Sequence, residues 1–325
     1  MNKKLEDVAR LAGVSKTTVS RVINHRGYLS QKTIDKVHAA IKELDYHPNT
    51  IARQLFTKKT NLVGILIPTV ANPFFGELTY YLEKELFAQG FKVLLGNVTN
   101  DPLEEEKYLQ KLLGHQVDGL ILGSHNLNIK EYQNSDLPIV AFDKRINDSV
   151  PIVESDSFLG GKLATQTLIE SGAKHIIHTD GPLKIDTPEK NRRIAYEKVM
   201  KQNNLEPITY TVDFNADFTQ KKNVLARIFK EHPDVDGIFA SNDIDALLLI
   251  NLAQELGYKI PDDLKIIGYD GTEYMQQLFP NLATIIQPIP AMAKKTALVL
   301  KDKLEQVETK KEYKFPVKLK RGKTI

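Results

Sequence analysis

The stretch VSKTTVSRVINHRGYLSQKT, residues 14–33, contains four Lys or Arg residues and one His, but no Asp or Glu. Ser15 is in position to cap a helix whose apolar side would be Val19, Val22 and Ile23. The hydroxyl and basic side chains of the segment would then lie on the outer side of that helix. We therefore expect a short helix that presents a cationic, hydrogen-bonding surface to a partner.

A helix is predicted on each side of this segment. Upstream, the apolar residues of LEDVARLA recur at helical spacing, and Gly13 suits the helix end because glycine tolerates a positive φ. Downstream, Ser30 would cap a helix whose apolar stripe includes Ile34, Val37 and Ile41. Two short helices joined by a tight turn form a helix-turn-helix. Residues 1–48 are therefore predicted to be a small three-helix domain.

The charge distribution predicts a polyanion as the partner of this domain. Residues 1–60 hold twelve Lys or Arg against five Asp or Glu, whereas the rest of the chain is acidic by four charges. A helix N-terminus in the major groove of double-stranded DNA brings side chains to base edges and hydroxyls to phosphates. The alternative is a solvated basic face with ordinary helix caps. The DNA contacts predicted here are Ser15, Lys16, Thr17, Thr18, Ser20, Arg21 and Asn24.

Residues 49–60 are predicted to form a hinge helix and linker. Pro48 would stop the preceding helix, and Asn49 can cap a new one. In a dimer, two such helices could pair in the minor groove, where Leu55 would wedge between base steps. The alternative is a flexible linker whose leucine packs on the rest of the chain. The DNA contacts predicted in this segment are Asn49, Ala52, Arg53 and Leu55.

Residues 61–325 alternate apolar strand segments with amphipathic helical ones, beginning with the strand NLVGILIP at 61–68. Repeated strand–helix–strand units predict an α/β fold with parallel sheets and helices on both faces. The motif VDGLI at 117–121 is nearly repeated by VDGIF at 235–239, which indicates two similar lobes. A ligand is then expected in the cleft between the lobes, at the carboxyl ends of the strands.

Candidate ligand-binding residues follow the predicted strand ends. Phe74 and Phe75 could offer an apolar platform to a sugar ring, although packing in the core is the competing interpretation. Asp143 could accept hydrogen bonds from sugar hydroxyls. Asn242 and Asp243 could do the same, with helix capping as the alternative.

Basic residues near these strand ends are also compatible with a phosphorylated sugar as the ligand. Arg192 would begin a helix, where a cation opposes the helix dipole, so it needs a ligand or a carboxylate from the other lobe. Lys144 and Arg145 follow Asp143 directly.

Three segments carry a family resemblance: LEDVARLAGVSKTTVSRVIN, VHAAIKELDYHPNTIARQL and TNLVGILIPTVANPFFGEL. They resemble the LacI (lactose-repressor) family of bacterial transcription factors, over about residues 4–320. The resemblance implies a helix-turn-helix head, a hinge helix and a two-lobed body like that of periplasmic binding proteins. It implies that Lys16, Thr17 and Arg21 read bases and that Leu55 is the hinge wedge. It also implies effector contacts from Arg192, Phe214 and Gln287, although Ala195 stands where the family often has Gly.

The function implied by this resemblance is repression of transcription. A cytoplasmic homodimer would bind a palindromic operator, and a sugar or sugar phosphate between the lobes would control that binding. The stretches NHRGYLS, IARQLFTKKTNLVG and IPTVANPFFGELTYYLE look most similar to those of family members that control sucrose utilisation. A regulator of another carbohydrate, or one that depends on a phosphocarrier protein, is the alternative; a sugar carrier or a glycosidase is the least favoured.

Composition excludes several other classes. The chain has no cysteine and no apolar run long enough to cross a membrane, and its N-terminus does not have the pattern of an export signal. It contains none of the motifs of P-loop, serine-hydrolase, zinc-protease or dinucleotide-binding enzymes. We therefore expect a protein that is not an enzyme and that uses no cofactor or metal.

Overall fold

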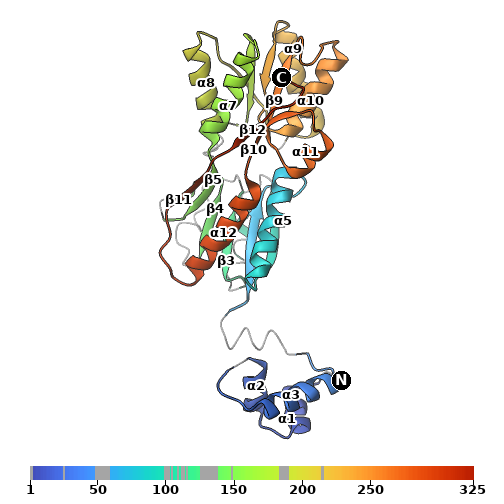
Figure 1. The fold of residues 1–325 in the computed structure, drawn as a ribbon, viewed down its shortest axis with the longest axis vertical. Coiled ribbons are helices and arrows are strands. Elements are labelled where there is room, and N and C mark those ends of the chain that lie inside the picture. The colour runs from blue at the N-terminus through green and yellow to red at the C-terminus, as the bar shows by residue number, and fades with distance from the viewer. Residues whose placement is uncertain are drawn as a thin grey trace. The chain divides into compact units, whose positions relative to one another are not determined.

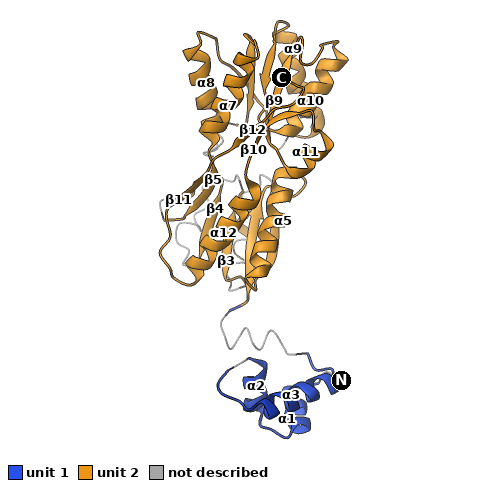
Figure 2. Cartoon of the chain, viewed as in Figure 1, with its two compact units in different colours: residues 1–59 blue, residues 60–325 orange. Residues whose placement is uncertain are grey.

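The computed structural model describes residues 3–24, 26–47, 59–98, 103, 105–107, 110, 114, 116–124, 138–147, 149–182, 190–213 and 216–325. The chain divides into two compact units, residues 1–59 and 60–325 (Figure 2). The predicted hinge falls mostly outside the described residues. Within the described residues, every helix is too short or too polar to cross a membrane.

The first unit contains three helices, α1 (Leu5–Ala12), α2 (Lys16–Ile23) and α3 (Gln31–Glu43). Local sequence sets their ends as predicted. Gly13 ends α1 in the left-handed conformation, with φ 65°. The hydroxyl of Ser15 accepts the N–H of Thr18, and the hydroxyl of Ser30 accepts the N–H of Thr33. These caps confirm the predicted helix-turn-helix.

The core of this unit is small and lies where the three apolar stripes meet. Val8, Val19 and Val37 are fully buried, one from each helix. The structure adds Tyr46 to this core, beyond the end of α3, together with small residues that the sequence interpretation had not placed there. Leu5, Val14, Ile34 and Ile41 pack against the cluster while remaining partly exposed.

The second unit has two lobes, each built on a six-stranded sheet (Figure 1). Lobe 1 has the strand order β11-β5-β4-β3-β1-β2, and every described pairing in it is parallel. Its strands are β1 (Leu62–Ile67), β2 (Lys92–Asn97), β3 (Gly119–Leu122), β4 (Ile139–Phe142), β5 (Ile152–Ser155) and β11 (Glu312–Phe315).

Lobe 2 has the strand order β12-β10-β9-β8-β6-β7. It is parallel except for β12, which runs antiparallel to β10. Its strands are β6 (Ile176–Asp180), β7 (Ile208–Thr211), β8 (Gly237–Phe239), β9 (Lys265–Asp270), β10 (Ala283–Ile286) and β12 (Lys318–Lys320). The predicted α/β class with parallel sheets is therefore confirmed for both lobes.

Helices cover the sheets and close the cores. In lobe 1, α5 (Pro73–Ala88) and α12 (Ile289–Leu304) pack together in one core cluster. In lobe 2, α7 (Ser157–Glu170) and α8 (Lys190–Gln202) share one core cluster. Another joins α9 (Phe218–Glu231) and α10 (Asp243–Glu255). The short helix α11 (Glu273–Leu278) follows β9.

The repeated VDG motif has the same structural role in both lobes. Its glycine begins β3 in lobe 1 and β8 in lobe 2, which occupy equivalent places in the two sheets. Asp118 accepts the backbone N–H groups of Thr60 and Asn61, and Asp236 accepts those of Lys174 and His175. Each aspartate thus fastens the segment that leads into the neighbouring strand, β1 or β6.

Three described segments connect the lobes (Figure 1). They run from β5 to α7, from β10 to α12, and from β11 to β12. Because the chain crosses three times, the strand ends of both lobes are held close to one boundary. The candidate ligand residues that the structure describes follow strand ends at this boundary.

Candidate functional site

The outer face of α2 carries the basic side chains predicted to meet DNA. Lys16, Thr17 and Arg21 are exposed, whereas Val19 and Val22 of the same helix are buried. The Nζ of Lys16 forms an ion pair with Glu6 of α1. Both groups are largely exposed, so a phosphate can compete with Glu6 for the lysine.

The other predicted head contacts also serve the helix itself. Ser15 and Thr18 hydrogen-bond to each other at the N-terminus of α2. The side-chain amide of Asn24 donates to the carbonyl and, at 3.4 Å, to the hydroxyl of Ser20. Of the residues predicted to contact DNA, Asn49, Ala52, Arg53 and Leu55 lie outside the described residues.

The candidate ligand residues of the two lobes approach one another around a buried arginine. Arg192, in the first turn of α8, is 4% exposed, and its Nη1 donates to the carbonyl of Ser241 at 3.1 Å. Its guanidinium carbon lies 3.5 Å from the centre of the Tyr269 ring, as in a cation–π contact. Asp143 of lobe 1, just past β4, is close enough to Arg192 for the arginine to act on its pKa.

The charge of Asp143 depends on this environment. Burial raises the pKa of Asp143 to about 6, the positive charge of Arg192 opposes that rise, and the negative charge of Glu154 adds to it. The Oδ1 atom of Asp143 is buried and accepts no hydrogen bond from the described residues. A buried acceptor without a donor is costly, so a ligand hydroxyl at this position would remove that cost.

A second buried acceptor lies at the crossover from β10 to α12. Gln287 is 3% exposed, and its Nε2 donates to Oδ1 of Asp270 at 2.8 Å. Its Oε1 accepts no hydrogen bond from the described residues. Asp270 has φ 103°, a conformation rare outside glycine. Backbone strain of this kind is often found at ligand sites.

Two glycines in α7 allow this packing. A Cβ on Gly160 would overlap the hydroxyl of Tyr269, and a Cβ on Gly161 would overlap the backbone of Arg192. The adjacent pair in SFLGGKLA therefore lets a strand side chain and the start of α8 both approach α7.

The side chains of Asn242 and Asp243 already form hydrogen bonds with other groups of the protein. Oδ1 of Asn242 accepts the N–H of Asp245 and caps α10, which is the capping alternative stated above. Asp243 is 2% exposed and accepts the N–H of Gly271 and the hydroxyl of Thr284. Burial raises the pKa of Asp243 to about 7, against the effect of these two donors.

The remaining candidates in lobe 1 also make internal contacts. Phe74 and Phe75 are 6% and 8% exposed and belong to the lobe 1 core. Arg145 is exposed and forms an ion pair with Glu312 at 3.3 Å. Lys144 is buried, and burial lowers its pKa while Glu105 opposes this. Phe214, the remaining candidate, lies outside the described residues.

Sequence reasoning missed two residues of this site. Asp270 could have been found, because it is the last residue of the strand KIIGYD, and Asp143 directly follows β4. Tyr269 could not, because an aromatic inside a strand gives no sign of which cation it will meet.

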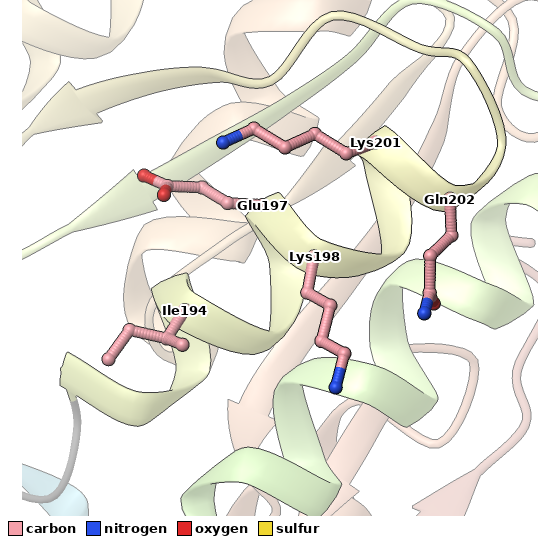
Figure 3. A pocket seen from close by; sticks show the side chains of 5 residues that line it. All are labelled: Ile194, Glu197, Lys198, Lys201 and Gln202. Carbon is pink, nitrogen blue, oxygen red and sulfur yellow. The ribbon is translucent and has the colours of Figure 1, made fainter.

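A separate hollow of about 450 Å³ lies on the exposed face of α8, lined by Ile194, Glu197, Lys198, Lys201 and Gln202 (Figure 3). None of the residues that line it belongs to the contact between Asp143 and Arg192.

Comparison with known proteins defines the class. Residues 4–49 match the family of bacterial regulatory proteins called the lacI family. Residues 60–311 match the periplasmic binding proteins and sugar binding domain of the LacI family. The chain therefore belongs to the LacI family of transcription regulators and is not an enzyme.

Several relatives are similar to this chain over nearly its whole length. The sucrose operon repressors of Pediococcus pentosaceus and Streptococcus mutans are 44% and 42% identical, each over 100% of both chains. A ribose operon repressor of Halalkalibacterium halodurans is 39% identical, covering 97% of this chain and 95% of the relative. The lac repressor dimer bound to operator and an anti-inducer superimposes with a TM-score of 0.88 at 26% identity, covering 100% of this chain and 99% of that one.

Proposed function

We propose that this protein represses a sucrose-utilisation operon. As a homodimer in the cytoplasm it binds a palindromic operator through the outer face of α2, and sucrose or a sugar derived from it binds between the lobes. Sugar binding favours a lobe arrangement in which the two heads hold the operator less tightly. An effector can shift DNA affinity only by its differential affinity for the two arrangements.

The strongest support for a sugar effector is the pair of buried acceptor atoms at the lobe boundary. Oδ1 of Asp143 and Oε1 of Gln287 accept no hydrogen bond from the described residues, and Arg192 lies beside Asp143. Neighbouring hydroxyls of a sugar ring are donors that can satisfy such atoms. Because Asp143 belongs to lobe 1 and Arg192 to lobe 2, a ligand that contacts both holds the lobes together.

The charges around this site favour an uncharged sugar over a sugar phosphate. Of the three bases that a phosphate could use, Arg145 is paired with Glu312 and Lys144 is buried. Arg192 acts on the pKa of two carboxylates, Asp143 and Asp180. A doubly charged phosphate beside those carboxylates would be repelled by them.

Relatives support sucrose as the sugar. Three sucrose operon repressors are 41–44% identical to this chain over 98–100% of its length. Ribose is the second candidate, since ribose operon repressors of 32–39% identity also cover most of the chain.

The test is binding of the full-length protein to DNA from the region upstream of its own gene. Fluorescence anisotropy would follow the labelled duplex while sucrose, fructose, sucrose 6-phosphate and ribose are added in turn. We expect salt-sensitive binding that sucrose or fructose weakens. Binding released by ribose alone would assign the second candidate, and binding that no sugar changes would refute sugar control.

The hinge is tested separately, because Leu55 lies outside the described residues and its role rests on the family resemblance. We expect Leu55→Ala to weaken operator binding while sugar binding, measured by calorimetry, stays unchanged. Loss of both activities would instead indicate a general folding defect.

A further inference from the structure

The two lobes also touch where α5 meets α11. Oε2 of Glu77 on α5 accepts the backbone N–H of Glu273 on α11 at 2.7 Å. Oε2 of Glu273 in turn accepts the hydroxyl of Tyr81 on α5 at 3.4 Å. Figure 1 shows α11 beside the end of α5 at the boundary of the lobes. Residues almost two hundred positions apart therefore join the lobes through two hydrogen bonds.

This contact brings two carboxylates together. The pKa of Glu77 is raised, first by burial and then by the negative charge of Glu273, against the effect of the N–H that it accepts. The pKa of Tyr81 is raised by burial and by the charges of both glutamates. The titratable groups at this contact are Glu77, Glu273 and Tyr81, with Tyr80 next to Tyr81.

We propose that Glu77, Tyr81 and Glu273 form a latch between the lobes that protonation of Glu77 tightens. An ionised Glu77 accepts the N–H of Glu273 but repels its carboxylate. A protonated Glu77 keeps one oxygen as acceptor and gains an O–H that donates to the carboxylate of Glu273. The proton comes from solvent, and no other group changes charge.

The sign of the effect follows from linkage. Joined lobes raise the pKa of Glu77 above its value in separated lobes, where water surrounds the side chain. Protonation therefore favours the joined arrangement. The stabilisation of the joined arrangement by protonated Glu77 is fully present below the ordinary glutamate pKa of about 4.3. It is lost as pH rises through the raised pKa of Glu77.

The consequence for regulation rests on the proposed function. If closure of the lobes on a sugar controls DNA binding, the proton acts as a second ligand of the same equilibrium. It changes the apparent affinity for the sugar without touching Asp143 or Arg192, because apparent affinity depends on the population of the binding arrangement.

The experiment measures the distance between the lobes and uses neither sugar nor DNA, so it is independent of the proposed function. The chain has no cysteine, which allows spin labels at two introduced cysteines only. Lys294→Cys on α12 of lobe 1 and Lys201→Cys on α8 of lobe 2 replace exposed residues. Labelled chains are mixed with excess unlabelled protein, and pulsed electron resonance then reports distances within one chain.

In this assay we expect the fraction with the joined-lobe distance to rise as pH falls from about 7.5 to about 4.5. Glu77→Gln, which cannot ionise, should give a distribution that changes less with pH than that of the unmodified chain, because only the titration of Asp143 at the lobe boundary remains. Glu77→Ala, which has no acceptor, should shift the population toward separated lobes at every pH. Thermal unfolding of each variant checks that it is folded.

Glu83→Gln is the matched control, because Glu83 is an exposed glutamate of the same helix. It should retain the pH profile of the unmodified chain. A Glu77→Gln profile that follows pH as steeply as that of the unmodified chain, or a Glu77→Ala variant with unchanged distances, would overturn the latch.

Discussion

The guanidinium of Arg192 stacks on the ring of Tyr269 at 3.5 Å and is anchored by the carbonyl of Ser241. Arg192 is thus held within lobe 2 before any ligand arrives, while its charge acts on Asp143 across the lobe boundary. An arginine held in place loses little conformational entropy when it binds. In the proposed sugar site, the lobe 2 side chain would therefore already be in position when Asp143 of lobe 1 approaches.

Arg192→Ala should abolish the response to sugar and leave operator binding in place. The substitution removes the cation beside Asp143 but touches no residue of the head. Allosteric coupling is typically about 1–3 kcal/mol, so the loss corresponds to about a 5–150-fold change in operator affinity that sugar no longer produces. Anisotropy titration with and without sugar measures it.

Arg193→Ala is the control for that experiment. Arg193 is the next residue, but it pairs with Glu197 on its own helix at 2.7 Å. It should keep the sugar response. Equal loss in both variants would mean that disturbance of α8, not the cation at position 192, is responsible.

Arg21→Ala should weaken specific operator binding by about 1–3 kcal/mol, the range for an arginine that contacts a base edge. Arg21 is exposed on α2, one turn beyond Thr17. Competition between operator and unrelated duplex, repeated at several salt concentrations, separates base reading from phosphate contact. Lys42→Ala on α3 is an exposed basic control; the same loss there would indicate a nonspecific charge effect.

Asp143 should make sugar affinity depend on pH. Its pKa is raised to about 6 by burial, so the carboxylate is ionised above that pH and accepts hydroxyl hydrogen bonds most strongly there. We expect the sugar Kd to rise as pH falls through 6, by up to about tenfold per pH unit. For folding the sign is opposite: protonation stabilises the body, and this contribution is lost as pH rises through 6.

Calorimetry in the Glu77→Gln background isolates this effect from the latch. Asp143→Asn should weaken binding and flatten the profile between about pH 5 and 7. A profile that still bends near pH 6 in the Asn variant would assign the titration to another group.

Gly161→Ala should destabilise lobe 2 by about 1–3 kcal/mol, because the added methyl overlaps the backbone of Arg192. Urea unfolding measures the change, and the sugar response should fall with it. Gly123→Ala is the control, since a Cβ there meets its nearest neighbour at 3.5 Å, an ordinary contact. If the two variants were equally stable, the close approach of α7 and α8 would not depend on Gly161.

The dimer surface should include α5 and α11. Phe87 on α5 and Leu278 on α11 are 67% and 69% exposed, and the contact between Glu77 and Glu273 joins the two helices. Large exposed apolar side chains on neighbouring elements are typical of a subunit interface. We expect Phe87→Glu together with Leu278→Glu to give monomers in sedimentation and to weaken operator binding. Phe218→Glu on α9, also 67% exposed, should remain dimeric.

The sequence by itself determined the features that depend on neighbours along the chain. The caps at Ser15 and Ser30, the end of α1 at Gly13 and the order of strands and helices follow from local hydrogen bonds and apolar spacing. The sequence also indicated a role for Arg192, because a cation in the first turn of a helix is unfavourable against the helix dipole unless a ligand or carboxylate compensates it.

Only the tertiary structure decided what the polar side chains at the strand ends contact. Asp143 directly follows β4 and Asp243 begins α10 a few residues after β8, yet the first keeps a free acceptor near Arg192 while the second binds Gly271 and Thr284. The partners of Asp243 come from β10 and the end of β9 within lobe 2, whereas Arg192 approaches Asp143 from the other lobe. A contact between residues far apart in the chain depends on how the whole lobe packs, which no local pattern encodes.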